Sequence, residues 1–189
     1  MNKKNKFLSI IVVVVVIIGA FVMKAYNQLI TLDNKVEAEW SQVENVMQRR
    51  ADLIPNLVSS VQGSMTQEKE VLKEITEARK AYAGAKSSSE KGQANEQIEK
   101  GLVNFVTVLN EDYPKLASSE NVKTLMTQLE GSENRISVER RNYIQAVETY
   151  NQQISKFPDK IIAKLLGFEK KTNYVATEQG KEVPQVEFK

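Results

Sequence analysis

The residues of this chain that could do chemistry are limited in kind, because its 189 residues include neither cysteine nor histidine. Disulfides, thiolate zinc sites and cysteine nucleophiles are therefore excluded, and so is an imidazole base. Neither a Gly-x-Ser-x-Gly motif nor a phosphate-binding glycine loop occurs. We expect no catalytic residues, no metal and no cofactor, and the chain does not resemble an enzyme.

An acidic edge is the nearest approach to a metal-binding pattern. Glu68, Glu70, Glu74 and Glu77 follow one another closely, and carboxylates alone can bind calcium or magnesium. Di-metal sites in helical bundles, however, combine glutamate with histidine. A solvated helix face is the favoured interpretation.

Four charged residues fall in rows of otherwise apolar residues: Asp33, Arg50, Glu133 and Arg140. A charge on a packing surface is costly unless it is paired and hydrogen-bonded. We expect Arg140 or Arg50 to pair with Glu133 or Asp33 across two helices. The alternative is a polar pocket within a helical bundle that binds a ligand.

Two asparagines accompany these charges, Asn56 beside Pro55 and Asn134 beside Arg135. Buried polar groups need partners, so we expect both amides to bond to freed backbone carbonyls. The alternative is a conformational hinge at Pro55 that is used in signalling.

The elements that position these residues follow from apolar spacing. Apolar or aromatic residues recur every seventh position from Val122 to Phe157, and a second row runs from Leu29 to Leu57. The second row passes Pro55 in phase, which favours one helix over residues 26–62, kinked at the proline. A true break at Pro55 is the alternative.

Shorter elements fill the middle of the chain. We expect a helix over residues 68–83, a polar loop over 83–95 and a helix marked by residues 98–109, with a cap at Ser118 or Ser119 before the last long helix. A short amphipathic segment should end at Gly167, before an extended or mobile tail. The fold class is all-α, an antiparallel up-and-down four-helix bundle with long first and last helices.

The N-terminal segment from Phe7 to Met23 is free of charge and almost wholly apolar. Its length is at the short end for a transmembrane helix. A cleaved signal peptide or a buried core helix is the alternative, but no Ala-x-Ala site follows the segment. Lys3, Lys4 and Lys6 precede it and Lys24 follows it, so the positive-inside rule places the N-terminus in the cytoplasm.

The remainder of the chain gives no reason to expect a nucleic-acid partner. The whole chain has a net charge of +2. The first 24 residues carry four lysines and no acid, which leaves the rest slightly acidic. Such a body has no basic footprint for nucleic acid, and the expected partners are the lipid bilayer and other envelope proteins.

Several motifs together resemble the LemA family. They are "WSQVENVMQRRADLIPNLVSSVQG", "EARKAY", "ENRISVERRNYIQAVETYNQQISKFP" and "LLGF", in this order behind a membrane segment. The resemblance implies an antiparallel helical bundle on one membrane helix in a bacterial protein, and little chemistry. The family resemblance implies a Tyr-Asn pair at two turns of the last helix. This sequence keeps the pair at Tyr150-Asn151 but departs from the pattern at Tyr143, which is followed by Ile144.

These observations predict four regions: a basic cytoplasmic N-terminus (1–6), a transmembrane helix (7–23), a helical bundle (26–157), and an amphipathic segment with an extended tail (158–189). We expect a single-pass protein of the cytoplasmic membrane whose bundle lies outside that membrane and acts as a non-catalytic scaffold or adaptor. The alternative is a sensor that binds a ligand or peptide, with its hinge at Pro55. An accessory of a membrane protease is a third interpretation, which rests on family association alone.

Overall fold

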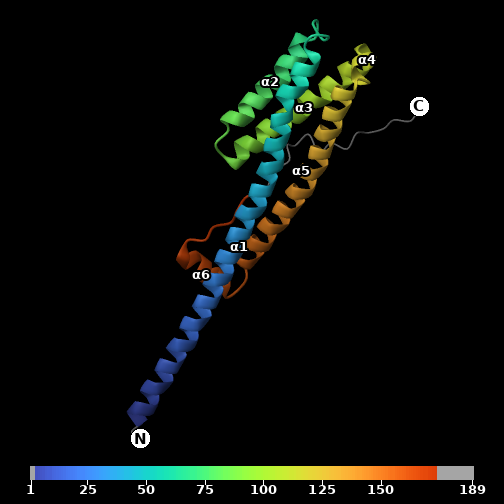
Figure 1. Cartoon of the computed structure of the whole chain (residues 1–189). Helices are drawn as coiled ribbons and strands as arrows, with labels where there is room; N and C mark the ends of the chain where they lie inside the picture. Colours follow the sequence, from blue (N-terminus) through green and yellow to red (C-terminus); the bar gives the residue numbers. More distant parts are fainter. Residues whose placement is uncertain (1–2, 174–189) are drawn as a thin grey trace, which may run out of the picture. The chain divides into compact units, whose positions relative to one another are not determined.

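The fold is known from a computed structural model, which describes residues 3–173. Six helices make up the described chain: α1 (Lys3–Val61), α2 (Lys69–Gly84), α3 (Ser88–Asp112), α4 (Pro114–Ala117), α5 (Glu120–Gln153) and α6 (Asp159–Leu166) (Figure 1). No residue between 3 and 173 is in a strand. The all-α prediction with long first and last helices is confirmed, with 59 residues in α1 and 34 in α5.

Pro55 lies inside α1 and does not end it. The expectation of one helix through the proline is thus confirmed, and the alternative of a break is wrong. Ala51, Ile54 and Leu57 are almost completely buried around it. Their packing maintains the helix although Pro55 has no N–H to bond the carbonyl of Ala51.

The expected polar loop over residues 83–95 is wrong for most of its length, because α3 already begins at Ser88. Ser87 is the N-cap: its hydroxyl accepts a hydrogen bond from the Glu90 N–H, and the Glu90 carboxylate accepts one from the Ser87 N–H. This reciprocal capping box satisfies two donors at the helix start. It turns a serine-rich stretch into the first turn of a helix.

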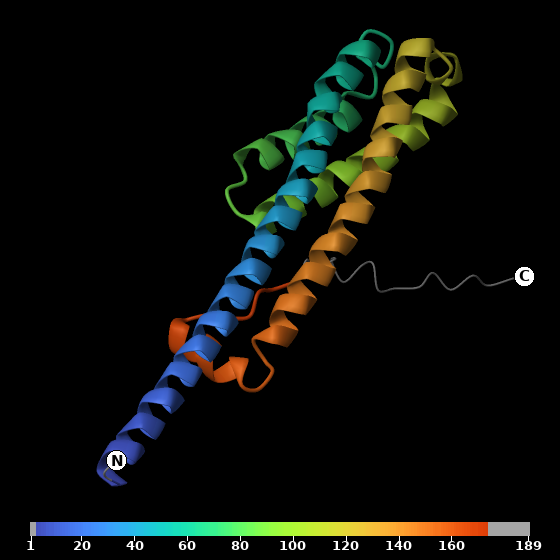
Figure 2. The ribbon, with the colours of Figure 1, turned by 60° about the horizontal axis from the view of Figure 1, so that its bottom comes forward.

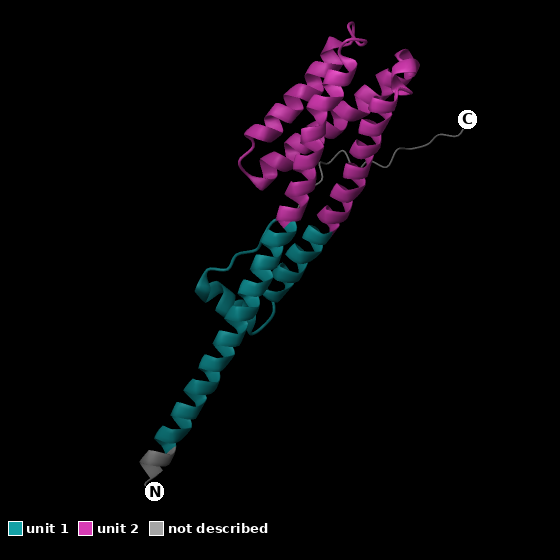
Figure 3. Cartoon of the chain, in the orientation of Figure 1, with its two compact units in different colours: residues 1–39, 142–189 teal, residues 40–141 magenta. Residues whose placement is uncertain are grey.

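Two compact units make up the chain, residues 1–39 with 142–189 (unit 1) and residues 40–141 (unit 2) (Figure 3). The expected division of the chain, with a single bundle over residues 26–157, stays a prediction. The up-and-down four-helix arrangement of the whole body stays a prediction.

Unit 2 contains α2, α3, α4 and the adjoining parts of α1 and α5. Helices α2 and α3 lie side by side in Figures 1 and 2. All four long segments contribute buried residues, among them Met47, Ile75, Phe105 and Ile136, none of which exposes any surface. The heptad rows of the sequence therefore face the core of this unit.

Unit 1 contains the N-terminal part of α1, the C-terminal part of α5, and α6. Its core is formed by Leu29, Val36, Ala146, Val147, Tyr150, Ile154 and Ala163. Helix α6 ends as expected at Gly167, which has a left-handed φ of 77°. Residues 168–173 follow without helical structure, and the rest of the expected extended tail lies outside the described residues.

Candidate functional site

A buried ion pair lies in the core of unit 2. Arg50 of α1 is 3% exposed, and its Nη1 lies 2.6 Å from Oε2 of Glu133 on α5, a side chain that is 36% exposed. The heptad rows of the two helices place both residues on core-facing positions. The structure therefore joins two of the four charges that the sequence singled out.

Burial dominates the electrostatics around Arg50, and the pKa of its guanidinium is lowered as a result. Burial lowers the pKa of its guanidinium and the nearby Arg140 lowers it further, while Glu133 and Glu99 oppose the change. Arginine still stays protonated at neutral pH because its ordinary pKa exceeds about 12. Among the described residues, no hydrogen-bond partner is found for the buried Nε of Arg50. A buried donor without a partner is unusual in a settled core.

Arg50 and Glu133 also line a groove of about 590 Å³ in unit 2. Its apolar lining comes from α3, α4 and the first half of α5: Leu102, Val103, Val106, Leu109, Ala117, Met126 and Leu129. Glu99, Glu130 and Lys123 add charge to the same lining. Val103 is 64% exposed although it is apolar. The groove therefore combines an exposed hydrophobic surface with neighbouring carboxylates.

The other residues singled out from the sequence lie elsewhere. Arg140 is half-buried and close enough to Arg50 to act on its pKa, but it does not line the groove. Asn56 and Asn134 are exposed, and no side-chain hydrogen bond to a freed carbonyl is found for either within residues 3–173. Their expected role assumed burial, which neither side chain has.

The acidic edge is a solvated face in the structure. Glu68, Glu70, Glu74 and Glu77 are not buried. Glu70 pairs with Lys73 at 3.6 Å and Glu74 accepts a hydrogen bond from Asn104 at 3.2 Å. Over residues 3–173, no group of three or more His, Cys, Asp or Glu side chains could hold a metal ion.

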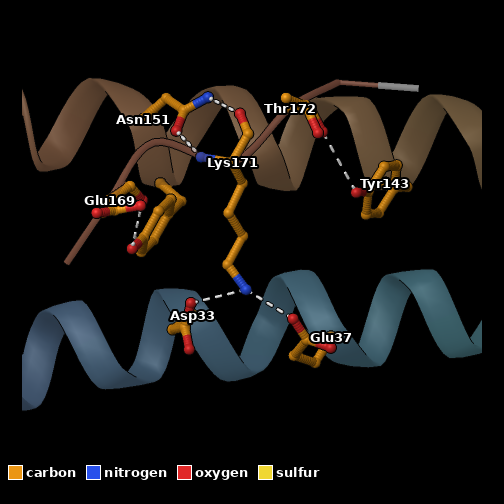
Figure 4. Close-up of polar contacts among 8 residues, drawn as sticks. Asp33, Glu37, Tyr143, Asn151, Glu169, Lys171 and Thr172 are labelled. Atoms are coloured by element: carbon orange, nitrogen blue, oxygen red, sulfur yellow. Dashed lines mark hydrogen bonds and ion pairs between the residues drawn. The ribbon is translucent and has the colours of Figure 1, made fainter. Parts of the chain in front are cut away.

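A second polar cluster, in unit 1, holds the segment after α6 (Figure 4). Lys171 extends its Nζ to two carboxylates of α1, Asp33 at 2.8 Å and Glu37 at 2.6 Å. Of the two carboxylates proposed as partners of an arginine, Glu133 pairs with Arg50 and Asp33 pairs with this lysine. We call residues 169–172 and their partners on α1 and α5 the C-terminal clamp.

Side chains of α5 bond the backbone of the same segment. Asn151 donates from Nδ2 to the Lys171 carbonyl at 2.8 Å and accepts from the Lys171 N–H at 2.9 Å. The Tyr150 hydroxyl donates to the Glu169 carbonyl at 3.0 Å, and that of Tyr143 reaches the Thr172 carbonyl at 3.5 Å. These bonds fix an irregular segment whose backbone has no helical partners.

The ion pairs of Lys171 stabilise the clamp. Burial lowers the pKa of the Lys171 ammonium, but the bonds to Asp33 and Glu37 outweigh that effect, so the pKa is raised. The ammonium also lies 5.7 Å from the centre of the Tyr150 ring, a favourable cation–π distance. Sequence reasoning missed Lys171; only the neighbouring Tyr150-Asn151 pair marked its binding partners.

Comparison with known proteins identifies the family of this chain. The sequence profile of the LemA family matches residues 39–188. The chain belongs to the LemA family. The match includes α2 to α6 and all of α1 beyond Ala38.

Distant relatives within this family are magnetosome proteins. MamQ 2 and MamQ 1 of Paramagnetospirillum magneticum (strain AMB-1) are each 26% identical over 182 residues, which covers 83% of this chain and 66% of theirs. MamQ of Magnetospirillum gryphiswaldense (strain MSR-1) is 25% identical over 170 residues, covering 77% of this chain and 62% of its own. The chain spans slightly less than two thirds of the length of these relatives.

Within residues 3–173 of this LemA-family chain, one helix is long and apolar enough to cross a membrane. The apolar stretch in α1 has no buried residue in its most hydrophobic window. Phe7, Ile10, Val16 and Met23 each expose more than 60% of their surface. An unburied apolar stretch of this kind is a candidate membrane anchor, and the alternative of a buried core helix is wrong.

Proposed function

We propose that this LemA-family protein is a non-catalytic, membrane-anchored adaptor of the bacterial cell envelope. The observation that carries the proposal is the exposed apolar stretch from Phe7 to Met23, which continues without interruption into the packed part of α1. Exposed large apolar surface of this extent is stable only in lipid or against a partner. The protein would thus hold two compact helical units at the membrane.

Its orientation follows from the lysines, with the N-terminus in the cytoplasm and the two units on the opposite side. Three lysines precede the apolar stretch within six residues, and one follows it. Because the chain has no cysteine, single cysteines can report on each side. Ser88→Cys in unit 2 should react with a membrane-impermeant maleimide in intact cells, whereas Asn5→Cys should react only after permeabilisation. The reverse pattern would overturn the orientation and leave the anchor intact.

The groove of unit 2 is the surface that we propose binds a partner protein. Its lining is apolar along α3 and the first half of α5, and Glu99, Glu130 and Glu133 outnumber Lys123 among its unburied charged residues. We expect the partner to insert a segment that carries apolar side chains and at least one lysine or arginine. Arg50 also lines the groove, and its ion pair with Glu133 would hold the Glu133 carboxylate in position.

A matched pair of valines tests this adaptor role. Val103 lines the groove and is 64% exposed, whereas Val138 lies outside the groove on α5 and is 49% exposed. A photo-crosslinking amino acid at position 103 should give discrete products in intact cells, and one at position 138 should not. Glu130→Lys should weaken the capture at position 103 by at least about threefold, because it repels a basic segment. Equal capture at both positions, or no effect of Glu130→Lys, contradicts the proposal.

A ligand-sensing role for the same groove is the second candidate. The observation that favours it is the buried Nε of Arg50, which has no hydrogen-bond partner within residues 3–173. A small ligand with an apolar body and one acceptor could meet that donor. Binding of such a ligand would then raise the thermal stability of the wild type but not of Arg50→Met, whereas a partner protein would be detected by crosslinking at Val103.

A further inference from the structure

Helix α6 exposes an apolar face that the core of unit 1 does not use. Ile162 and Ala163 are buried at 8% and 2% exposure, but Ile161 and Leu165 are 61% and 82% exposed. The last two are four residues apart, so they lie on one face of the helix. Phe157, in the loop just before α6, is also 82% exposed. Together Phe157, Ile161 and Leu165 form what we call the α6 face.

Lysines accompany this face. Lys156, Lys160 and Lys164 are exposed and fall next to its three apolar residues in sequence. The acid within the same stretch, Asp159, is only 9% exposed and accepts a hydrogen bond from Gln153. An apolar face flanked by lysines, on a helix too short to cross a membrane, is typical of segments that lie in the lipid–water interface.

The position of α6 within unit 1 agrees with this composition. The ring of Phe168, two residues after α6, lies 6.2 Å from the ring of Tyr26 in an edge-on arrangement. Tyr26 is three residues beyond Met23, where the apolar stretch of α1 ends, a rise of about 4.5 Å along the helix. Figures 1 and 2 both show α6 beside this part of α1. Ala163 also shares the unit 1 core with Leu29 of α1.

We propose that the α6 face binds the surface of the same bilayer that α1 crosses, with Phe157, Ile161 and Leu165 among the acyl chains and the lysines at anionic headgroups. The inference rests on the proposed anchoring by residues 7–23. The bilayer surface must start close to Met23, and α6 is the element packed at that level. Lysines near an anionic surface strengthen such binding.

A second copy of the chain is a less suitable occupant. In a two-fold dimer the same face would meet itself, so the three lysines of each copy would lie close to those of the other. Three apolar side chains provide far less contact area than the roughly 1,200 Å² of a stable interface. Lipid headgroups, by contrast, supply the negative charge that the lysines need.

Labels at single introduced cysteines test the inference in the full-length protein. Reconstituted vesicles would contain phosphatidylcholine with about one third phosphatidylglycerol, with or without a lipid that carries a quencher in its acyl chain. The labelled variants are Leu165→Cys on the α6 face, Gln145→Cys at an exposed position of α5 in the same unit, and Val15→Cys in the apolar stretch. All three sites are solvent-facing in the isolated chain, so none should disturb the core.

The lipid-borne quencher should reduce fluorescence at position 165 at least about twofold more than at position 145, and most strongly at position 15. Lys160→Glu combined with Lys164→Glu should lower the quenching at position 165 and leave position 15 unchanged.

Equal quenching at positions 165 and 145, with position 15 quenched, overturns the inference while the anchor stands. Loss of quenching at position 15 refutes the anchor itself. Concentration-dependent protection of position 165 without lipid quenching would indicate a second copy of the chain, and would equally overturn the inference.

Discussion

At the scale of single residues, the Arg50–Glu133 pair links α1 to α5 and should contribute to the stability of unit 2. Removing one partner of a buried pair costs about 3–5 kcal/mol because a charge is left uncompensated. Glu133 is 36% exposed, so water can reach it, and we expect Glu133→Gln to cost less, about 1–3 kcal/mol of unfolding free energy. Urea unfolding measures this.

The matched control for that variant is Glu130→Gln, which changes an exposed carboxylate of the same helix and should shift stability by less than about 0.5 kcal/mol. Charge reversal, Glu133→Arg, should destabilise further, and Arg50→Glu in the same chain should restore part of the loss. Absence of any restoration would mean that the two residues do not interact in solution.

Tyr82 makes the stability of unit 2 depend on pH in the alkaline range. Burial raises the pKa of its phenol to about 12, with Glu44 and Asp52 adding to the effect, and its hydroxyl donates to the Glu44 carbonyl at 3.3 Å. A pKa that is raised in the folded state stabilises the protein below the unfolded pKa of about 10, and this stabilisation is lost as pH rises toward the folded value. The wild type should thus lose about 2 kcal/mol of unfolding free energy between pH 10 and 12 that Tyr82→Phe does not lose. Thermal melts of both proteins between pH 10 and 12 measure this difference. Parallel curves of melting temperature against pH would contradict a role for Tyr82.

At the scale of elements, the C-terminal clamp depends on Asn151. Its amide makes two hydrogen bonds to the backbone of Lys171, each worth about 1 kcal/mol net. Asn151→Ala should therefore free residues 169–172 at a cost of about 2 kcal/mol, seen as faster amide exchange in that segment. Gln152→Ala, at the exposed neighbouring position, is the matched control. Unchanged exchange in Asn151→Ala would show that Lys171 and the tyrosines alone hold the segment.

The start of α3 depends on the capping box of Ser87 and Glu90. Ser87→Ala removes the side-chain acceptor of the Glu90 N–H and should cost about 1 kcal/mol. Ser89→Ala changes another serine of the same stretch that is exposed, and should have a much smaller effect. Amide exchange over residues 88–95 should rise in the first variant only; equal exchange in the two would mean that the cap does not set the helix start.

How much of the helical structure can be predicted from the sequence depends on how local each sequence signal is. The heptad rows through Leu29 and Val122 identified α1 and α5 because an apolar period survives over many turns, even across Pro55. The serines and glycine around the start of α3 favour a loop, whereas Ser87-x-x-Glu90 is a capping-box pattern that marks the start of this helix. The sequence therefore holds two opposing local signals at this point, and the capping box decides the structure.

Long-range contacts left no such signal. Lys171 bonds Glu37, which is 134 positions away, and no periodicity relates the two. Arg50 and Glu133 were found because both interrupt an apolar row, whereas Lys171 lies where no row exists. Charges are thus predictable as pairing partners when they disturb a pattern, and not when they lie in an irregular segment.

At the scale of the whole molecule, the apolar stretch of α1 is the candidate membrane anchor. A charge at its centre tests this directly. Arginine in place of Val14 should raise the free energy of insertion by about 2.5–3.5 kcal/mol, and so move part of the protein from the membrane to the soluble fraction. Val138→Arg, at an exposed valine of unit 2, adds the same charge outside the stretch and should leave the distribution unchanged.

The measurement is fractionation after alkaline carbonate extraction, which keeps integral proteins in the pellet. A chain that is released intact and uncleaved as readily with Val14 as with arginine at that position is not anchored, and both the adaptor role and the bilayer contact of α6 would then fail together.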